Sequence, residues 1–182
     1  MIPLTPWIER TFDWTPSLGV FRAILERLRG TPARLVDKLS EFEAAALTAR
    51  TDGRWSMQEH AGHLIELEKL WQTRIEEFIY FAPRLAPADM SNRGTNEAGY
   101  NQMPISSILI RFRQQRMQTI GMLEDLDEDI VGRLSFHPRL RKNIRLLDLM
   151  IFMSEHDDHH LAVIQNLIEH RNKSQISTFE NP

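Results

Sequence analysis

The stretch IRLLDLMIFMSEHDDHHLAVIQNLIE, residues 144–169, is the most informative part of the chain. Its apolar positions recur at alternating spacings of three and four, which is typical of a helix with one face turned into a bundle. The positions on that face are Leu149, Met153, His156, His160, Val163 and Leu167. The pattern predicts one continuous helix with two histidines on its inward face.

These two histidines favour a metal site. His156 and His160 are four residues apart, so their rings lie one turn apart on the same side of the helix. They could be core histidines held by hydrogen bonds, but each ring would then need its own polar partner in an apolar layer. A shared divalent ion would satisfy both rings, although it needs a third ligand from elsewhere. His159 lies off this face and is expected to be solvated or to contact a ligand.

The remainder of the chain is also helical in pattern. Gly30 is expected to end a first helical segment, and Thr31-Pro32 to start the next with Thr as N-cap. Ser56-Met57-Gln58-Glu59 is a capping box that opens a long helix. The helices expected before the last one are residues 16–29, 31 to about 46 or 50, 56 to about 80, and 104 or 106 to about 126.

Four long helices and an N-terminal accessory helix predict an all-α fold, an antiparallel four-helix bundle. No stretch shows the sustained alternation of a strand. Residues 82–103 and 127–142 are expected to be irregular, and a loop as long as the first is often functional. We expect a single domain over residues 1–172 and a flexible tail over residues 173–182.

Composition excludes several classes of protein. A chain of 182 residues with a net charge of -3 has the size of one domain and argues against a nucleic-acid partner. The absence of cysteine excludes disulfides, thiolate ligands and a cysteine nucleophile. The N-terminus has no apolar signal core, and no apolar run is long enough to span a bilayer. We therefore expect a cytoplasmic protein with no membrane partner.

The helix that begins at Ser56 offers two candidates for the third ligand. His60 aligns with Leu64 and Trp71 near the middle of the apolar stripe, whereas His63 aligns with Leu67 on its flank. Periodicity alone does not choose between them.

Two motifs resemble the DinB/YfiT-like family. Residues 55–64, WSMQEHAGHL, are similar to the signature W-S-x-x-E-x-x-x-H-L, and residues 156–161, HDDHHL, are similar to the C-terminal H-x-x-x-H helix of that family. The resemblance extends to about residue 170. It implies a four-helix bundle, commonly a homodimer, with one divalent metal ion held by His63, His156 and His160. It also implies that His60 is not a ligand.

A site of three imidazoles has defined chemical consequences. It leaves at least one coordination position open, where a bound water or thiol can become a nucleophile. The ligand type does not distinguish zinc, nickel, iron and manganese. Glu59 and Asp157 lie near the ligands along their helices and are candidates to accept a hydrogen bond from a ligand ring and orient it. The alternative for each is a solvated surface carboxylate.

The resemblance implies a metal-dependent enzyme that acts on a small-molecule substrate. Some relatives are transferases that activate the thiol of a small cofactor such as bacillithiol or mycothiol, and others are proposed hydrolases. A low-molecular-weight thiol is therefore a candidate co-substrate. The alternative is a non-catalytic, metal-stabilised binding or scaffold protein of the stress response. A zinc protease of the H-E-x-x-H type is improbable, because Asp157 replaces the glutamate base and is one methylene shorter.

Three further positions carry weaker expectations. Arg116 could bind a substrate carboxylate, although a surface salt bridge is the commoner role of such a residue. His137 could approach the pocket and is assigned no role. The polar residues of the long loop, Asn92 and Asn96 among them, could line a pocket mouth, but a solvated loop is the simpler interpretation.

Overall fold

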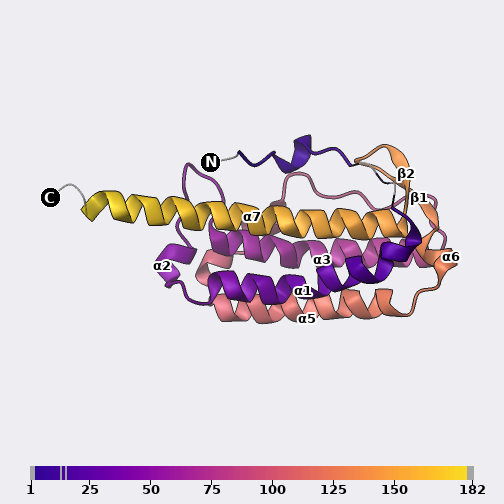
Figure 1. Cartoon of the computed structure of the whole chain (residues 1–182), viewed down its shortest axis with the longest axis horizontal. Helices are drawn as coiled ribbons and strands as arrows, with labels where there is room; N and C mark the ends of the chain where they lie inside the picture. Colours follow the sequence, from indigo (N-terminus) through magenta and orange to yellow (C-terminus); the bar gives the residue numbers. More distant parts are fainter. Residues whose placement is uncertain (1–2, 13, 15, 180–182) are drawn as a thin grey trace.

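Four long helices form the body of the molecule (Figure 1). They are α1 (Phe21–Leu39), α3 (Met57–Ile79), α5 (Ile105–Glu124) and α7 (Leu146–Phe179). The structure, a computed structural model, describes residues 3–12, 14 and 16–179. The predicted four-helix bundle is confirmed. None of the described helices is both long enough and apolar enough to cross a membrane.

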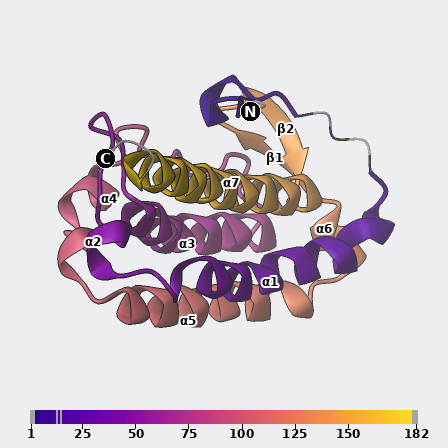
Figure 2. The same cartoon turned by 60° about the vertical axis from the view of Figure 1, so that its left-hand side comes forward.

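The long segment between α3 and α5 sets the directions of the helices. Both α1 and α3 pack against α5 and α7. After α3 the chain returns to the start of that helix, where the Ser56 hydroxyl donates to Asn101 Oδ1 at 2.7 Å. As a result α3 runs parallel to α5, and α1 runs parallel to α7, whereas the other two contacts are antiparallel (Figures 1 and 2). The bundle therefore does not simply alternate up and down.

The predicted break at Gly30 is wrong, because α1 continues through Pro32. Proline has no backbone N–H, so the carbonyl four residues earlier loses its helical donor. That carbonyl belongs to Leu28, and it accepts a hydrogen bond from Arg116 Nη1 at 3.2 Å. A side chain from α5 thus supplies the missing donor, and the expected accessory helix and the first bundle helix are one. This helix ends at Leu39, earlier than expected.

Short elements connect the long helices. The long segment is not entirely irregular: it contains α4 (Arg93–Glu97) and η3 (Tyr100–Gln102), and the ring of Tyr100 packs on Gly62. The remaining short helices are η1 (Trp7–Glu9), η2 (Leu18–Val20), α2 (Ala44–Leu47) and α6 (Glu128–Val131).

A small hairpin corrects the expectation of a purely helical chain. Strand β1 (Leu134–His137) pairs antiparallel with β2 (Lys142–Arg145), with Leu134 opposite Arg145. The hairpin lies at the end of the bundle where α7 begins (Figure 1). At the other end, α7 extends ten residues beyond the expected residue 169, through much of the predicted tail. Residues 180–182 of that tail lie outside the described residues.

A buried layer of charge divides the core into two apolar clusters. One cluster, at the hairpin end, contains Trp71 and Phe152, and the other contains Leu64 and Phe112. Three fully buried charged residues lie between the two clusters: Glu68 on α3, Arg116 on α5 and Asp157 on α7.

Arg116 is the centre of this layer. Its guanidinium, which is 0% exposed, pairs with Glu68 Oε1 at 2.6 Å and with Asp157 Oδ2 at 2.5 Å. Both roles considered for Arg116, at a substrate and at the surface, are therefore wrong. Since an unpaired buried charge is costly, the two ion pairs fix α3, α5 and α7 in one register.

Candidate metal centre

Three histidines from two helices converge on one point beside the charged layer. One ring nitrogen each of His63, on α3, and of His156 and His160, on α7, lies within 4.8 Å of the others. The Nε2 atoms of His156 and His160 are 3.2 Å apart. Two ligands of a tetrahedral ion, each about 2.0–2.1 Å from it, stand roughly 3.3 Å apart. The spacing of the α7 pair therefore suits a shared ion.

Local structure aims these rings. The capping box of Ser56 and Glu59 fixes the start of α3, nearly two turns before His63. The four-residue spacing of His156 and His160 places them on the side of α7 that faces α3, while Asp157 turns toward Arg116. The ion pair that holds α7 in register thus also sets the direction of the two histidines.

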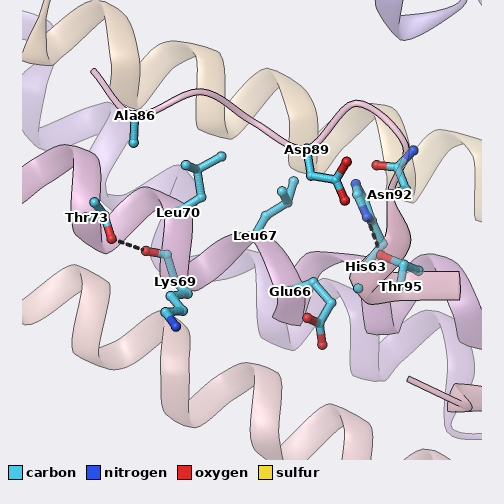
Figure 3. Close-up of a pocket in the computed structure, with 11 residues that line it drawn as sticks. His63, Glu66, Leu67, Lys69, Leu70, Thr73, Ala86, Asp89, Asn92 and Thr95 are labelled. Carbon is cyan, nitrogen blue, oxygen red and sulfur yellow. Dashed lines mark hydrogen bonds between the residues drawn. The ribbon is translucent and has the colours of Figure 1, made fainter. Parts of the chain in front are cut away.

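A hydrogen bond from α4 orients His63. Its Nδ1 atom lies 2.9 Å from the hydroxyl oxygen of Thr95, which is itself buried (Figure 3). The bond occupies one ring nitrogen and leaves Nε2 for a metal ion. A ligand ring is commonly held through its second nitrogen in this way. No pattern in the sequence marks Thr95 for this role.

His60 orients His160 in the same manner. The two Nδ1 atoms are 2.9 Å apart, while Nε2 of His160 faces His156. If His160 binds an ion through Nε2, its Nδ1 carries the proton and donates it to His60 Nδ1. This arrangement gives His60 a supporting position beside the ligands, and the cluster of three histidines does not include it.

The carboxylates expected to orient the ligands have other partners. Glu59 accepts hydrogen bonds from the guanidinium of Arg50 and, at 2.9 Å, from the backbone N–H of Ser56. Asp157 pairs with Arg116 and accepts a hydrogen bond from the Thr31 hydroxyl at 2.7 Å. Neither carboxylate bonds to a histidine ring among the described residues, so the expectation for Glu59 and Asp157 is wrong. Both are buried, so they are not solvated surface groups either.

Burial keeps the histidines neutral. It lowers the pKa of His63 to about 4, with a further contribution from His60, and it lowers the pKa of His60 to about 4. The pKa values of His156 and His160 lie well below the ordinary value, mainly through burial and also through the neighbouring histidines. Neutral imidazoles keep a lone pair for a metal ion, so this donor set fits a divalent cation.

A cavity of 220 Å³ adjoins the three histidines. One wall is a stripe on α3 formed by His63, Leu67, Leu70 and Arg74, which recur at helical spacing. Aromatic rings surround the centre: Trp55 lies 4.8 Å from His63 between ring centroids, and Trp7 of η1 lies 4.9 Å from His156. A second hollow, of 340 Å³, also reaches His63 and shares Leu67, Leu70, Asp89 and Asn92 with the first (Figure 3).

The residues that line the cavity test the expectations for the long loop and for His137. Asn92 lines it, whereas Asn96 accepts a hydrogen bond from the Trp55 indole at 2.9 Å. His137 and half-buried His159 also line the cavity. Sequence reasoning missed Trp7, Arg74 and Arg139 as lining residues. Of these three, only Arg74 could have been noticed in the sequence, because it is a cation within the apolar stripe of α3.

Comparisons with known proteins agree with this architecture. The sequence model of the DinB superfamily matches residues 25–164. The chain belongs to the DinB superfamily. No curated protein matches the sequence.

Two solved structures resemble this DinB-superfamily protein. YfiT from Bacillus subtilis, described as a probable metal-dependent hydrolase with an unusual four-helix bundle topology, aligns with a TM-score of 0.78 at 19% identity, over 90% of this chain and 94% of that chain. The mycothiol-dependent maleylpyruvate isomerase aligns with a TM-score of 0.63 at 10% identity, over 78% of this chain and 59% of the other. At these identities the likeness concerns the fold.

Proposed function

We propose that this protein binds one divalent metal ion through His63, His156 and His160 and acts as a metal-dependent enzyme on a small molecule. The observation that carries the proposal is the convergence of three buried, neutral imidazoles at the edge of a cavity. When bound, such an ion lowers the pKa of a coordinated water or thiol and polarises a carbonyl. Thr95 and His60 would orient two of the ligand rings, and the aromatic walls would restrict water.

Two reaction classes fit this arrangement. The description of YfiT supports hydrolysis, and the name of the mycothiol-dependent isomerase supports a reaction that uses a low-molecular-weight thiol, such as an S-transferase. The thiol would come from a co-substrate, since the chain has no cysteine. The cavity beside the histidines favours either enzyme over a scaffold, because a purely structural metal site is usually closed by its protein ligands. Homodimerisation and a cytoplasmic location remain predictions.

Metal analysis tests the ligand set. The protein purified without chelator or added metal should contain about one equivalent of a divalent ion. His63→Ala, His156→Ala and His160→Ala should each lose stoichiometric metal while circular dichroism shows an intact helical bundle. His170→Ala is the matched control, since His170 is an exposed histidine on α7 away from the cluster. A His156→Ala protein that kept stoichiometric metal would refute the ligand assignment.

Activity tests the catalytic part of the proposal. The metal-loaded protein should be screened with low-molecular-weight thiols paired with electrophiles, and separately with esters and amides. Any turnover should disappear in His156→Ala and persist in His170→Ala. A scaffold role would instead give no turnover, together with a large loss of unfolding free energy when the metal is removed.

A further inference from the structure

Besides the three histidines of the candidate metal centre, the cavity lining carries a concentration of positive charge. Arg74, Arg139 and His137 all line the cavity. Arg74 is 1% exposed, and it donates through Nε and Nη2 to the carbonyl of Ala86 at 2.9 and 2.7 Å. Arg139 donates through Nη2 to the carbonyl of Trp7 at 3.1 Å. Among the described residues, neither guanidinium forms an ion pair.

This lack of a counterion is exceptional for a buried charge in this protein. Arg116 pairs with two carboxylates, and buried Glu59 and Asp148 each have an arginine partner. The pKa of Arg74 is lowered to about 10, mainly by burial; Glu77 raises this pKa and the nearby Arg139 lowers it. Burial also lowers the pKa of Arg139. Both cations would therefore be stabilised by an anion in the cavity.

The hydrogen-bond partners of His137 also indicate an anion beside Arg74. Its Nδ1 atom lies 3.2 Å from the backbone N–H of Leu140, and its Nε2 atom lies 3.2 Å from Nη1 of Arg74. A neutral imidazole has one acceptor nitrogen and one N–H. Both neighbours of the His137 ring, the Leu140 N–H and Arg74 Nη1, are donors. In either tautomer the ring N–H therefore faces one of these donors instead of an acceptor. An oxyanion beside Arg74 would accept from Nη1 and from the His137 Nε2–H, which resolves the conflict.

Among the residues that the structure describes, one carboxylate lines the cavity, and its hydrogen bonds lie within its own loop. Asp89 accepts hydrogen bonds from the backbone N–H and the hydroxyl of Ser91 and from the backbone N–H of Arg93. These bonds use both of its oxygens within its own loop. Asp89 therefore does not neutralise the two arginines.

We propose that Arg74, His137 and Arg139 bind an oxyanion, a carboxylate or a phosphate, of the substrate. The guanidinium fork of Arg139 matches the geometry of both anions, and Arg74 adds its Nη1, since its Nε and Nη2 already donate to Ala86. With the anionic group held there, the rest of the molecule extends toward His63, His156 and His160. The cavity is smaller than the roughly 300–1,000 Å³ of typical ligand pockets, which favours a small anionic substrate. The assignment of the anion to a substrate rests on the proposed function, whereas the anion site itself does not need the metal.

Calorimetric titration tests the site directly. Inorganic phosphate and succinate are titrated, at constant ionic strength, into the protein as purified and after chelation. At least one of the two should bind in both forms. Arg139→Gln should weaken that binding on the order of ten- to a hundredfold, the range for a lost hydrogen bond to a charged group. Arg139→Lys, which keeps the charge but not the planar fork, should fall between this variant and the wild type.

Arg113→Gln is the matched control, since Arg113 is an exposed arginine on α5 and its substitution removes the same charge. Binding of phosphate alone or of succinate alone would support the site and identify the class of anion. Anion binding with this pattern in a protein that bound no metal would support the site while the proposed function failed. Failure of both anions to bind, or an equal loss in Arg113→Gln, would overturn the inference. If Arg139→Gln does not fold, Arg139→Lys carries the comparison.

Discussion

Acid should destabilise the metal-free protein steeply. Burial is the largest cause of a lowered pKa in six histidines, of which His159 is only half-buried. The other five are His60 and His63, each with a pKa of about 4, His137 with a pKa of about 3, and His156 and His160, whose pKa values lie well below the ordinary value. In the unfolded chain each returns to about 6.5. Unfolding below that pH therefore takes up protons, and the equilibrium shifts toward the unfolded state.

The size of the effect follows from these values. Because the folded-state pKa is depressed, the stabilisation is present in full above pH 6.5 and is lost as the pH falls from 6.5 toward about 4. Between pH 7.5 and 5.5 each histidine that stays neutral in the folded protein costs about 1.3 kcal/mol. Five such histidines cost about 7 kcal/mol together, which is comparable to the total stability of roughly 5–15 kcal/mol of a typical protein.

Urea unfolding, followed by circular dichroism at pH 7.5, 6.5 and 5.5 with a chelator present, measures this loss. His63→Gln should reduce the pH-dependent loss by about 1.3 kcal/mol, the share of one histidine. A total loss below about 1.5 kcal/mol over this range, little more than the share of one histidine, would refute the view that the cluster is held neutral.

Three other substitutions give separate predictions. His60→Leu should weaken zinc binding by about ten- to a hundredfold without changing the stoichiometry, because His160 loses its hydrogen-bond partner; an unchanged dissociation constant in a competition titration would contradict this. Arg116→Met should lower the free energy of unfolding by about 3–5 kcal/mol, because two buried carboxylates lose their cation; a loss under about 1 kcal/mol in urea would be inconsistent with that. Gly62→Ala should cost about 1–3 kcal/mol, since its Cβ would stand 2.3 Å from the ring of Tyr100, and an unchanged thermal midpoint would count against the close packing.

The sequence was sufficient for the parts of the structure that depend on periodicity. The spacing along residues 144–169 predicted a helix that presents His156 and His160 to the bundle, and α7 does so. The capping box at Ser56 predicted the start of α3, and both of its hydrogen bonds are present. His63 was different, because periodicity left it equal to His60 and only the family resemblance selected it. The structure brings both rings to the centre, in different positions.

The errors arose where a distant part of the chain determines local structure. Pro32 should end a helix, but a guanidinium from α5 satisfies the carbonyl that proline leaves free. The hairpin strands have four residues each, and the turn between them places Arg141, rather than a glycine or asparagine, in the left-handed conformation. For Asp157, proximity along the helix to His156 suggested a contact with its ring. The Asp157 side chain instead points to Arg116, because adjacent helical positions face different directions.

Arg116 contacts the other three long helices of the bundle. From α5 it reaches the Leu28 carbonyl on α1, Glu68 on α3 and Asp157 on α7. Asp157 directly follows His156 in the sequence. A shift of α7 by one residue would therefore place the Asp157 carboxylate in an apolar layer without its cation, and it would turn the His156 imidazole away from α3. A shifted α7 is therefore disfavoured electrostatically. On the proposed function, metal uptake should appear only in chains whose last helix has docked correctly, and metal loading would then report the completion of folding.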